Sequence, residues 1–313
     1  MIADHGLTLL IPSYKRPEPL AALLGRVRES GIGSEIDIIV ADDGPDAGVQ
    51  EVVRGFSDCG VRLIVNPTNI GYSRNLIQLF NACRTSCAIL SADDDLPDVD
   101  QIRALLSTPS GFSMGVTIYR SKNGAIYRPV QQGRVTGRYF RPASNHAPGI
   151  VYHVPDLANA IAYLARRLDG GCDFALTYPQ VVLLMYLLCE GRECRWIPLS
   201  PINEGSSEPS GVLNSKGIAY YAGSARLQEF FCLWSILEEL EALFPDDPTG
   251  ELGVMRREHN TNAFGLVSQA VLELKGFDAD LWRGSAVFNS LRSVRPSALL
   301  KFGADRIRRR FGR

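Results

Sequence analysis

Three consecutive aspartates, Asp93 to Asp95, follow a short apolar run in the stretch ILSADDDLP. Neighbouring carboxylates about 5–6 Å apart repel each other by about 3 kcal/mol at an effective dielectric constant near 20. A divalent cation with bound phosphates would offset this repulsion, because carboxylate oxygens are ligands that Mg²⁺ and Mn²⁺ prefer. We therefore interpret the motif as a metal–diphosphate site. The alternative is a solvated acidic turn that caps a helix starting near Asp98.

Three more polar segments each follow a predicted strand: PSYKR, ADDG and NPTNIGYSRN. Ligands of parallel α/β sheets bind in the crevice beyond the carboxyl ends of the strands. The four segments would therefore meet at one edge of such a sheet. This convergence is the strongest functional signal in the sequence.

The first hundred residues alternate strand and helix patterns, which predicts a mostly parallel sheet and an α/β fold. The expected strands are 7–11, 36–41, 61–65 and 87–90, and the expected helices are 17–28, 50–56 and 73–83. Farther along, Asn123-Gly124 predicts a hairpin between the strand-like runs 113–120 and 125–131. The remaining pattern predicts helices over 156–168, 178–190 and 226–244, a strand over 195–202 and a polar loop over 203–211.

Composition excludes several classes of protein. The 313 residues carry a net charge of −1, without the basic excess of nucleic-acid binders. No apolar run is long enough to span a bilayer, and the N-terminus lacks a signal-peptide pattern, so we expect a cytoplasmic protein. The seven cysteines form no CxxC pair and are expected to be free thiols, and the four histidines show no HExxH spacing. Dinucleotide (GxGxxG), P-loop (GxxxxGK[ST]) and acyl-transfer (GxSxG) motifs are also missing.

Four ordered motifs point to one family. The segments TLLIPSYKRPEPLAALL, IDIIVADDGPD, NPTNIGYSRNLIQLFNAC and AILSADDDLP resemble the N-terminal half of family-2 glycosyltransferases of the GT-A fold. The resemblance covers about residues 7–105. It implies a nucleotide-sugar-binding half over 1–110, an acceptor-binding half over 111–215 and a helical C-terminal region over 216–313.

The resemblance also assigns roles to residues. Tyr14 would stack on the nucleotide base, and Asp43, with Asp42 beside it, would accept a hydrogen bond from that base. Arg74 would face the phosphates or the aspartates, and the alternative is a cation on a helix surface. The full nucleotide-binding set that it implies is Pro12, Ser13, Tyr14, Arg16, Asp42, Asp43, Asn69, Gly71, Arg74 and Asp93.

The acidic motif departs from the family's common Asp-x-Asp-Asp, because Ser91 stands in the first position and Asp95 is an additional acid. On this alignment Asp93 faces the ribose or the metal, and Asp94 is the preferred ligand. A frame that uses Asp93 and Asp95 stays open. The expected metal site is therefore Asp93, Asp94 and Asp95, holding Mn²⁺ or Mg²⁺.

A catalytic base is harder to place. Relatives often carry a Glu-Asp pair at the start of a helix in the second half, where this sequence has Tyr178-Pro179-Gln180. Asp173 is the nearest acid and our first candidate for the base. The other candidates are Asp169 and Glu204. His146, His153 and His259 are considered as acceptor or phosphate contacts, with structural roles as the alternative.

The sequence thus predicts a metal-dependent, inverting hexosyl- or deoxyhexosyltransferase. The expected donor is a nucleotide-diphosphate sugar, UDP-linked by default, and the expected acceptor is a saccharide or lipid-linked saccharide, as in O-antigen or polysaccharide biosynthesis. Residues 295–313 carry seven Lys/Arg against one acid, which suggests peripheral contact with an anionic membrane or a solvated tail. The alternatives are a non-catalytic nucleotide-sugar-binding protein and a sugar nucleotidyltransferase, although a GxGxR-like loop is missing.

Overall fold

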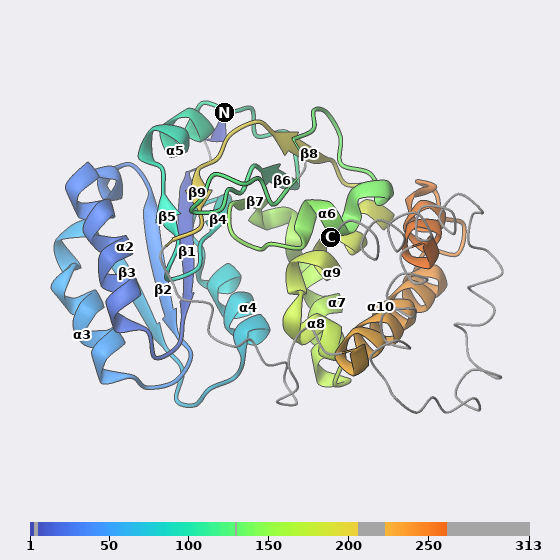
Figure 1. Ribbon diagram of the computed structural model, residues 1–313, viewed down its shortest axis with the longest axis horizontal. Coiled ribbons are helices and arrows are strands. Elements are labelled where there is room, and N and C mark those ends of the chain that lie inside the picture. The colour runs from blue at the N-terminus through green and yellow to red at the C-terminus, as the bar shows by residue number, and fades with distance from the viewer. Residues whose placement is uncertain (3–5, 129, 206–222, 262–313) are drawn as a thin grey trace, which may run out of the picture. The chain divides into compact units, whose positions relative to one another are not determined.

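A seven-stranded sheet in the order β3-β2-β1-β4-β7-β6-β8 forms the centre of the first part of the chain (Figure 1). Within this sheet only β7 runs antiparallel to its neighbours. The mostly parallel α/β fold predicted from the sequence is therefore confirmed. The strands are β1 (Leu7–Ser13), β2 (Asp37–Asp42), β3 (Val61–Val65), β4 (Cys87–Leu90), β6 (Met114–Thr117), β7 (Ile150–His153) and β8 (Cys194–Ile197).

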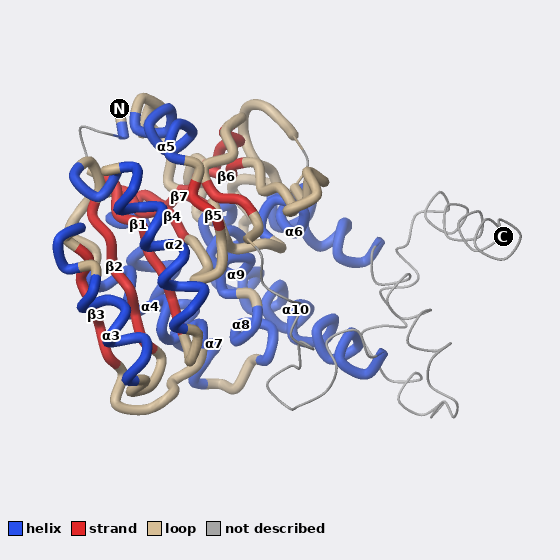
Figure 2. The backbone as a smooth tube through the Cα atoms, turned by 60° about the vertical axis from the view of Figure 1, so that its left-hand side comes forward, coloured by secondary structure: helices blue, strands red, loops and turns tan. Residues whose placement is uncertain are grey.

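Helices cover both faces of this sheet. Figure 2 shows α2 and α3 in front of the parallel strands and α4 behind them. The helices of this part are α2 (Pro17–Ser30), α3 (Ala47–Gly55), α4 (Tyr72–Ala82), α5 (Val99–Leu106), α6 (Phe140–Ser144), α7 (Ala158–Asp169), α8 (Asp173–Thr177) and α9 (Pro179–Cys189). The core is built from the strands and from the inner faces of the helices.

Local sequence explains where these elements start and stop. Helix α2 begins with Pro17, whose fixed φ suits the first helical turn, and ends before Gly31, which adopts φ +69°. Its buried side chains recur at helical spacing, namely Leu20, Leu23, Leu24 and Val27. Helix α9 is buried on nearly all sides, as its continuous apolar sequence predicts.

The predicted hairpin around Asn123-Gly124 forms only in part. Its turn is present, with the Ser121 N–H donating to the Ala125 carbonyl, but the second strand is reduced to a single bridge between Arg120 and Ile126. A second, two-stranded antiparallel sheet pairs β5 (Leu96–Pro97) with β9 (Ile202–Asn203). This pairing brings the start of the predicted polar loop 203–211 against the acidic motif.

The computed structural model describes residues 1–2, 6–128, 130–205 and 223–261. The chain divides into two units, Met1–Ser210 and Gly211–Arg313, and the predicted boundary at residue 110 stays a prediction. The second unit contains α10 (Gly223–Leu243) and a further helical stretch over 251–261. Among the described helices, none has the length and apolar character needed to cross a membrane.

Candidate active site

The carboxyl ends of the parallel strands meet at one edge of the sheet. Ser13, the last residue of β1, pairs in register with Asp42, the last residue of β2, and Asp42 pairs with Val65 at the end of β3. Ser91 follows β4 directly, and its N–H donates to the Leu10 carbonyl of β1. The polar segments that follow these strands therefore begin side by side.

Two aspartates of the acidic motif share one cation of the protein. Arg16 donates from its two terminal nitrogens to Asp93 Oδ1 at 2.9 Å and to Asp94 Oδ2 at 2.6 Å. The Ser13 hydroxyl donates to the other oxygen of Asp93 at 2.8 Å. Burial raises the pKa of Asp93 to about 6, although the Arg16 guanidinium and the Ser13 hydroxyl oppose the rise. Asp94 is the more exposed of the two carboxylates, with 15% of its side-chain surface open against 5% for Asp93.

Asp95 is oriented differently from its neighbours. One of its oxygens accepts from the Ala92 N–H at 2.7 Å, and the other accepts from the Tyr119 hydroxyl at 2.8 Å. The residue is buried, and this burial raises the pKa of Asp95 to about 7. Both oxygens are thus bound by donors of the protein itself. These two hydrogen bonds fix the shape of the acidic loop, and the metal role of Asp95 stays a prediction.

Asp93 and Asp94 fit a divalent cation. Their carboxylates are already arranged around a single positive group, the Arg16 guanidinium, and both supply hard oxygen donors. The described residues contain no group of three or more potential ligands placed to hold a metal. Mg²⁺ and Mn²⁺ bound with phosphates need only one or two carboxylates, since phosphate oxygens and waters complete the coordination.

A second cluster lies at the ends of β1 and β2. Tyr14 is 41% exposed, and a hydrogen bond with Asn69, together with one from Lys15, lowers the pKa of its hydroxyl. A Cβ on Gly44 would lie 3.4 Å from the Tyr14 ring and 3.6 Å from the Asn69 nitrogen, so these three residues lie close together. Gly44 adopts φ +132°, which favours glycine. An exposed tyrosine ring beside amide groups is suited to a nucleotide base.

Buried amides hold Asp43 in place. Its Oδ1 accepts from the Ile70 N–H at 2.8 Å and from the Asn66 amide at 3.3 Å. Asn66 in turn donates to Asn75, which donates to the Ala41 carbonyl. Sequence reasoning missed Asn66, although it directly follows β3 at the same edge of the sheet.

Asp42 does not share this arrangement. It is fully buried, and its Oδ2 accepts from the Asp46 N–H at 3.0 Å, just before α3. Burial raises the pKa of Asp42, and the Asp46 N–H opposes this rise. The carboxylate therefore supports the β2–α3 turn, and its contact with a nucleotide stays a prediction.

The α4 segment meets the expectation at one residue and departs from it at another. Gly71 precedes α4 with φ +84°, a value that a side chain would disfavour. Arg74 pairs with Asp169 of α7 at 2.9 Å, with both side chains well exposed. In this structure Arg74 is thus a helix-surface cation, and its phosphate contact stays a prediction.

Comparison with known proteins agrees with this geometry. The family model described as glycosyl transferase family 2 matches residues 8–167, about half of the chain, and this range includes the acidic motif and the three other polar segments that follow the strands. The chain belongs to glycosyl transferase family 2. A comparison with curated proteins gave no match.

Solved structures show that this glycosyltransferase has the GT-A fold. TarS from S. aureus (residues 1–349) superposes with a TM-score of 0.63 at 12% identity, covering 94% of this chain and 82% of that one. The chain spans half of the longer TarS structure. A mannosyltransferase from Pyrobaculum calidifontis superposes with a TM-score of 0.53 at 15% identity, covering 96% and 79%. At these identities the likeness concerns the fold.

The candidate bases of the glycosyltransferase belong to different elements of the fold. Asp173 begins α8, which is tied to the first turn of α4 because the Ser73 hydroxyl donates to the Ala175 and Leu176 carbonyls. Glu204 follows β9 and accepts hydrogen bonds from the Lys122 N–H and the Tyr127 hydroxyl. Asp169 is bound to Arg74, as described above. The choice between Asp173 and Glu204 stays open to experiment.

The histidines divide between the two units. His146 packs against Tyr127 and Tyr119 near the acidic motif, and burial lowers the pKa of its ring. His153 binds Asp156, which also accepts a hydrogen bond from the Ser113 hydroxyl. Ser113 directly precedes β6, so this group lies at the amino end of that strand. His259 belongs to the second unit, where it is buried and stacked on Phe230. The predicted membrane-binding tail, residues 295–313, lies outside the described residues.

Proposed function

We propose that the protein is a metal-dependent transferase that moves a sugar from a nucleotide diphosphate to an acceptor hydroxyl with inversion. The observation that carries the proposal is that two carboxylates, Asp93 and Asp94, and a cluster of polar and aromatic groups around Tyr14 and Asp43 follow neighbouring strands at one edge of the sheet. A nucleotide diphosphate carries a base, which suits the Tyr14 and Asp43 cluster, and a diphosphate, which suits a metal ion held by the two carboxylates. Sugar transfer is the family's reaction class, and the proposal is supported by Asp94, which is the more exposed of the two carboxylates.

The residues divide the work of binding. Tyr14 offers a ring face to the base, and Asp43, held by Asn66 and the Ile70 N–H, accepts from the base. Asp94, with Asp93, would hold Mn²⁺ or Mg²⁺ next to the diphosphate. When bound, such an ion stabilises the negative charge that develops on the leaving diphosphate. Arg16 lies against both carboxylates, so we expect it to move toward the phosphates when the ion binds.

A base must take the proton of the acceptor hydroxyl as the bond to the sugar forms. We retain Asp173 as the first candidate, supported by its place on α8 beside the first turn of α4. Glu204 is the alternative, supported by the position of Gly205 against the acidic loop. Turnover and donor affinity are measured for Asp173→Asn and for Glu204→Gln. The variant whose turnover falls at least a hundredfold while its donor affinity is unchanged identifies the base.

The donor is the first thing to test. Among proteins of the same fold, TarS has been crystallised with UDP-GlcNAc, and the P. calidifontis mannosyltransferase with GDP-Man and Mn²⁺. UDP is our default, and GDP, CDP and dTDP complete a thermal-shift panel, each with Mn²⁺, Mg²⁺ or EDTA. A ligand at 100 times its dissociation constant stabilises the fold by about 2.7 kcal/mol.

The expected result is a metal-dependent shift with one nucleotide that disappears in Asp94→Ala. Asp100→Ala is the matched control, because Asp100 is a strongly exposed acid on the neighbouring α5. Absence of any nucleotide shift in the unmodified protein would refute the donor site. Binding without hydrolysis or transfer would instead favour the non-catalytic alternative. NMR of the anomeric proton in donor and product tests inversion.

The finer biological setting belongs to the same proposal. A saccharide or lipid-linked saccharide acceptor, as in O-antigen synthesis, fits a cytoplasmic enzyme at the inner face of the membrane. The basic composition of residues 295–313 supports this location. Sedimentation with anionic vesicles tests it, because a chain lacking these residues should lose vesicle binding. Equal binding by both chains would show that the tail is not an anchor.

A further inference from the structure

Three aromatic rings stack beside the acidic motif. The rings of Tyr127 and His146 lie 4.7 Å apart at 26°, those of Tyr119 and Tyr127 lie 5.7 Å apart at 29°, and those of Tyr119 and His146 lie 5.6 Å apart. Tyr119 is buried, whereas Tyr127 is 42% exposed. The cluster therefore runs from the interior of the unit to its surface.

A buried arginine fixes this cluster from within. Arg128 is 1% exposed, and its guanidinium lies 5.5 Å from the centre of the Tyr119 ring. It donates to the Thr117 carbonyl at 2.7 Å, to the His146 carbonyl at 2.8 Å and to the Pro148 carbonyl. Arg128, the neighbour of Tyr127 in the chain, thus connects the end of β6 with the segment that carries His146. A ring held in this way is available for binding without a large loss of conformational entropy.

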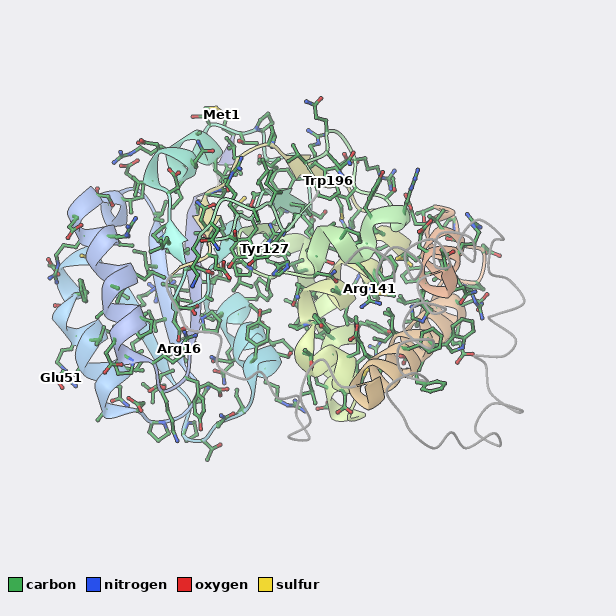
Figure 3. The ribbon with its side chains drawn as sticks, viewed as in Figure 1. Met1, Arg16, Glu51, Tyr127, Arg141 and Trp196 are labelled. Carbon is green, nitrogen blue, oxygen red and sulfur yellow. The ribbon has the colours of Figure 1, made fainter. Side chains whose placement is uncertain are left out.

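The cluster is bonded to the acidic motif by two routes. The Tyr119 hydroxyl donates to Asp95, and the Tyr127 hydroxyl donates to Glu204 at 3.2 Å. The residue after Glu204 is Gly205, where a Cβ would lie 1.6 Å from the Asp94 carbonyl oxygen. The backbone next to Glu204 therefore packs directly on the loop of Asp94. Figure 3 labels Tyr127 at one end of these contacts and Arg16, which donates to the Asp94 carboxylate, at the other.

An exposed ring next to a carboxylate is suited to a sugar. The C–H groups of a pyranose carry partial positive charge and pack on the negative face of an aromatic ring, while its hydroxyls donate to a carboxylate. We propose that Tyr127, with Glu204 beside it, binds a saccharide ring of the acceptor. This inference rests on the proposed function and specifies the acceptor's chemistry.

The surroundings favour a sugar over a purely apolar partner. Ile126 and Val130 are also exposed, at 46% and 53%, so the segment around Tyr127 presents apolar surface. The Glu204 carboxylate lies within that surface and accepts from the Lys122 N–H as well. A lipid chain would add no hydrogen-bond donor to this carboxylate beyond the Lys122 N–H and the Tyr127 hydroxyl, whereas a saccharide supplies several hydroxyls.

The test uses the full-length protein with UDP and Mn²⁺ and methyl glycosides of glucose, galactose, mannose, N-acetylglucosamine and rhamnose. Saturation-transfer NMR detects weak binding, and titration gives the dissociation constants. At least one glycoside should bind the unmodified protein. In Tyr127→Ala its dissociation constant should rise about tenfold, which corresponds to about 1.4 kcal/mol.

Two variants serve as controls, with melting temperatures confirming the fold of each. Tyr127→Phe keeps the ring and should bind within threefold of the unmodified protein. Ile126→Ala removes an equally exposed apolar side chain beside the ring and should also stay within threefold. Failure of all five glycosides to bind, or equal affinity in Tyr127→Ala, overturns the proposal. A sedimentation change in Tyr127→Ala would show an interface between copies and overturns it too.

The UDP thermal shift in the same samples separates this proposal from the proposed function. UDP binding without glycoside binding refutes only the saccharide site at Tyr127. Glycoside binding that is lost in Tyr127→Ala, in a protein that binds none of the four nucleotides, refutes the transferase and supports the saccharide site.

Discussion

The hydrogen bond from Tyr119 to Asp95 should make a measurable and pH-dependent contribution to stability. Tyr119→Phe removes the hydroxyl and keeps the ring, so packing against Tyr127 and His146 is retained. Both partners are buried, with exposures of 6% and 3%, so water does not replace the lost donor. Hydrogen bonds to charged groups contribute about 1.5–3 kcal/mol, against about 1 kcal/mol for neutral pairs.

The protonation state of Asp95 decides which value applies. Burial raises the pKa of Asp95 to about 7 in the folded protein, above its ordinary value of 3.8. The folded state therefore holds a proton between about pH 4 and pH 7 that the unfolded state has released, and stability falls as the pH rises through this window. At pH 8 the carboxylate is charged, so Tyr119→Phe should cost about 2 kcal/mol. At pH 5.5 the cost should fall to about 1 kcal/mol.

Urea denaturation at the two pH values, without divalent ions, measures this difference. Thermal denaturation offers a second measurement, in which a loss of about 2 kcal/mol lowers the melting temperature of a unit of about 200 residues by roughly 4–8 °C. Tyr127→Phe is the matched control, because its hydroxyl binds Glu204 at the surface and should cost less than 0.5 kcal/mol at either pH. An equal cost of Tyr119→Phe at both pH values would refute the assignment of Asp95 as a buried, titrating partner.

Three further predictions concern the same edge of the sheet. Gly205→Ala should lower the free energy of unfolding by about 1–3 kcal/mol, because the new Cβ would meet the Asp94 carbonyl. Gly25→Ala on α2, where a Cβ meets nothing, should raise it by about 0.5–1 kcal/mol. Urea denaturation measures both changes. Asn75→Ala should cost about 1–3 kcal/mol and weaken nucleotide binding in the thermal-shift assay, since it removes the acceptor of one Asn66 hydrogen bond and the amide that donates to the Ala41 carbonyl. Unchanged affinity would show that Asp43 does not need this support. Arg74→Ala should change stability by less than 0.5 kcal/mol, because its pair with Asp169 is exposed, and a drop in nucleotide affinity would show that Arg74 turns to the phosphates.

Much of the fold could be predicted because its signals are local. The apolar runs that became β1 to β4 and the helical spacing of α2 are properties of short segments. The meeting of their polar ends follows from the rule for parallel sheets. The pairing of Arg16 with the aspartates was not predicted, but the segment that carries it was placed correctly.

The parts that could not be predicted depend on contacts between distant residues. Asp95 resembled a metal ligand in sequence, and only its bond to Tyr119, 24 residues away, shows its different orientation. Arg74 has its partner on α7, which no spacing rule connects with α4. The turn at Asn123-Gly124 was predicted, whereas the stack of Tyr127 on His146 arises from the fold and left no periodic signal in the sequence.

The pairing of β5 with β9 has a consequence for how the protein is made. It joins Leu96 to Asn203, so the acidic loop is covered by a segment that the ribosome adds 203 − 96 = 107 residues later. At about 5–20 residues per second, roughly 5–20 s pass between the synthesis of the two partners. During this interval the nascent chain carries Asp93 to Asp95 without Gly205 packed against them. This edge of the sheet, the candidate active site, is therefore completed late, after the strands that support it have been synthesised.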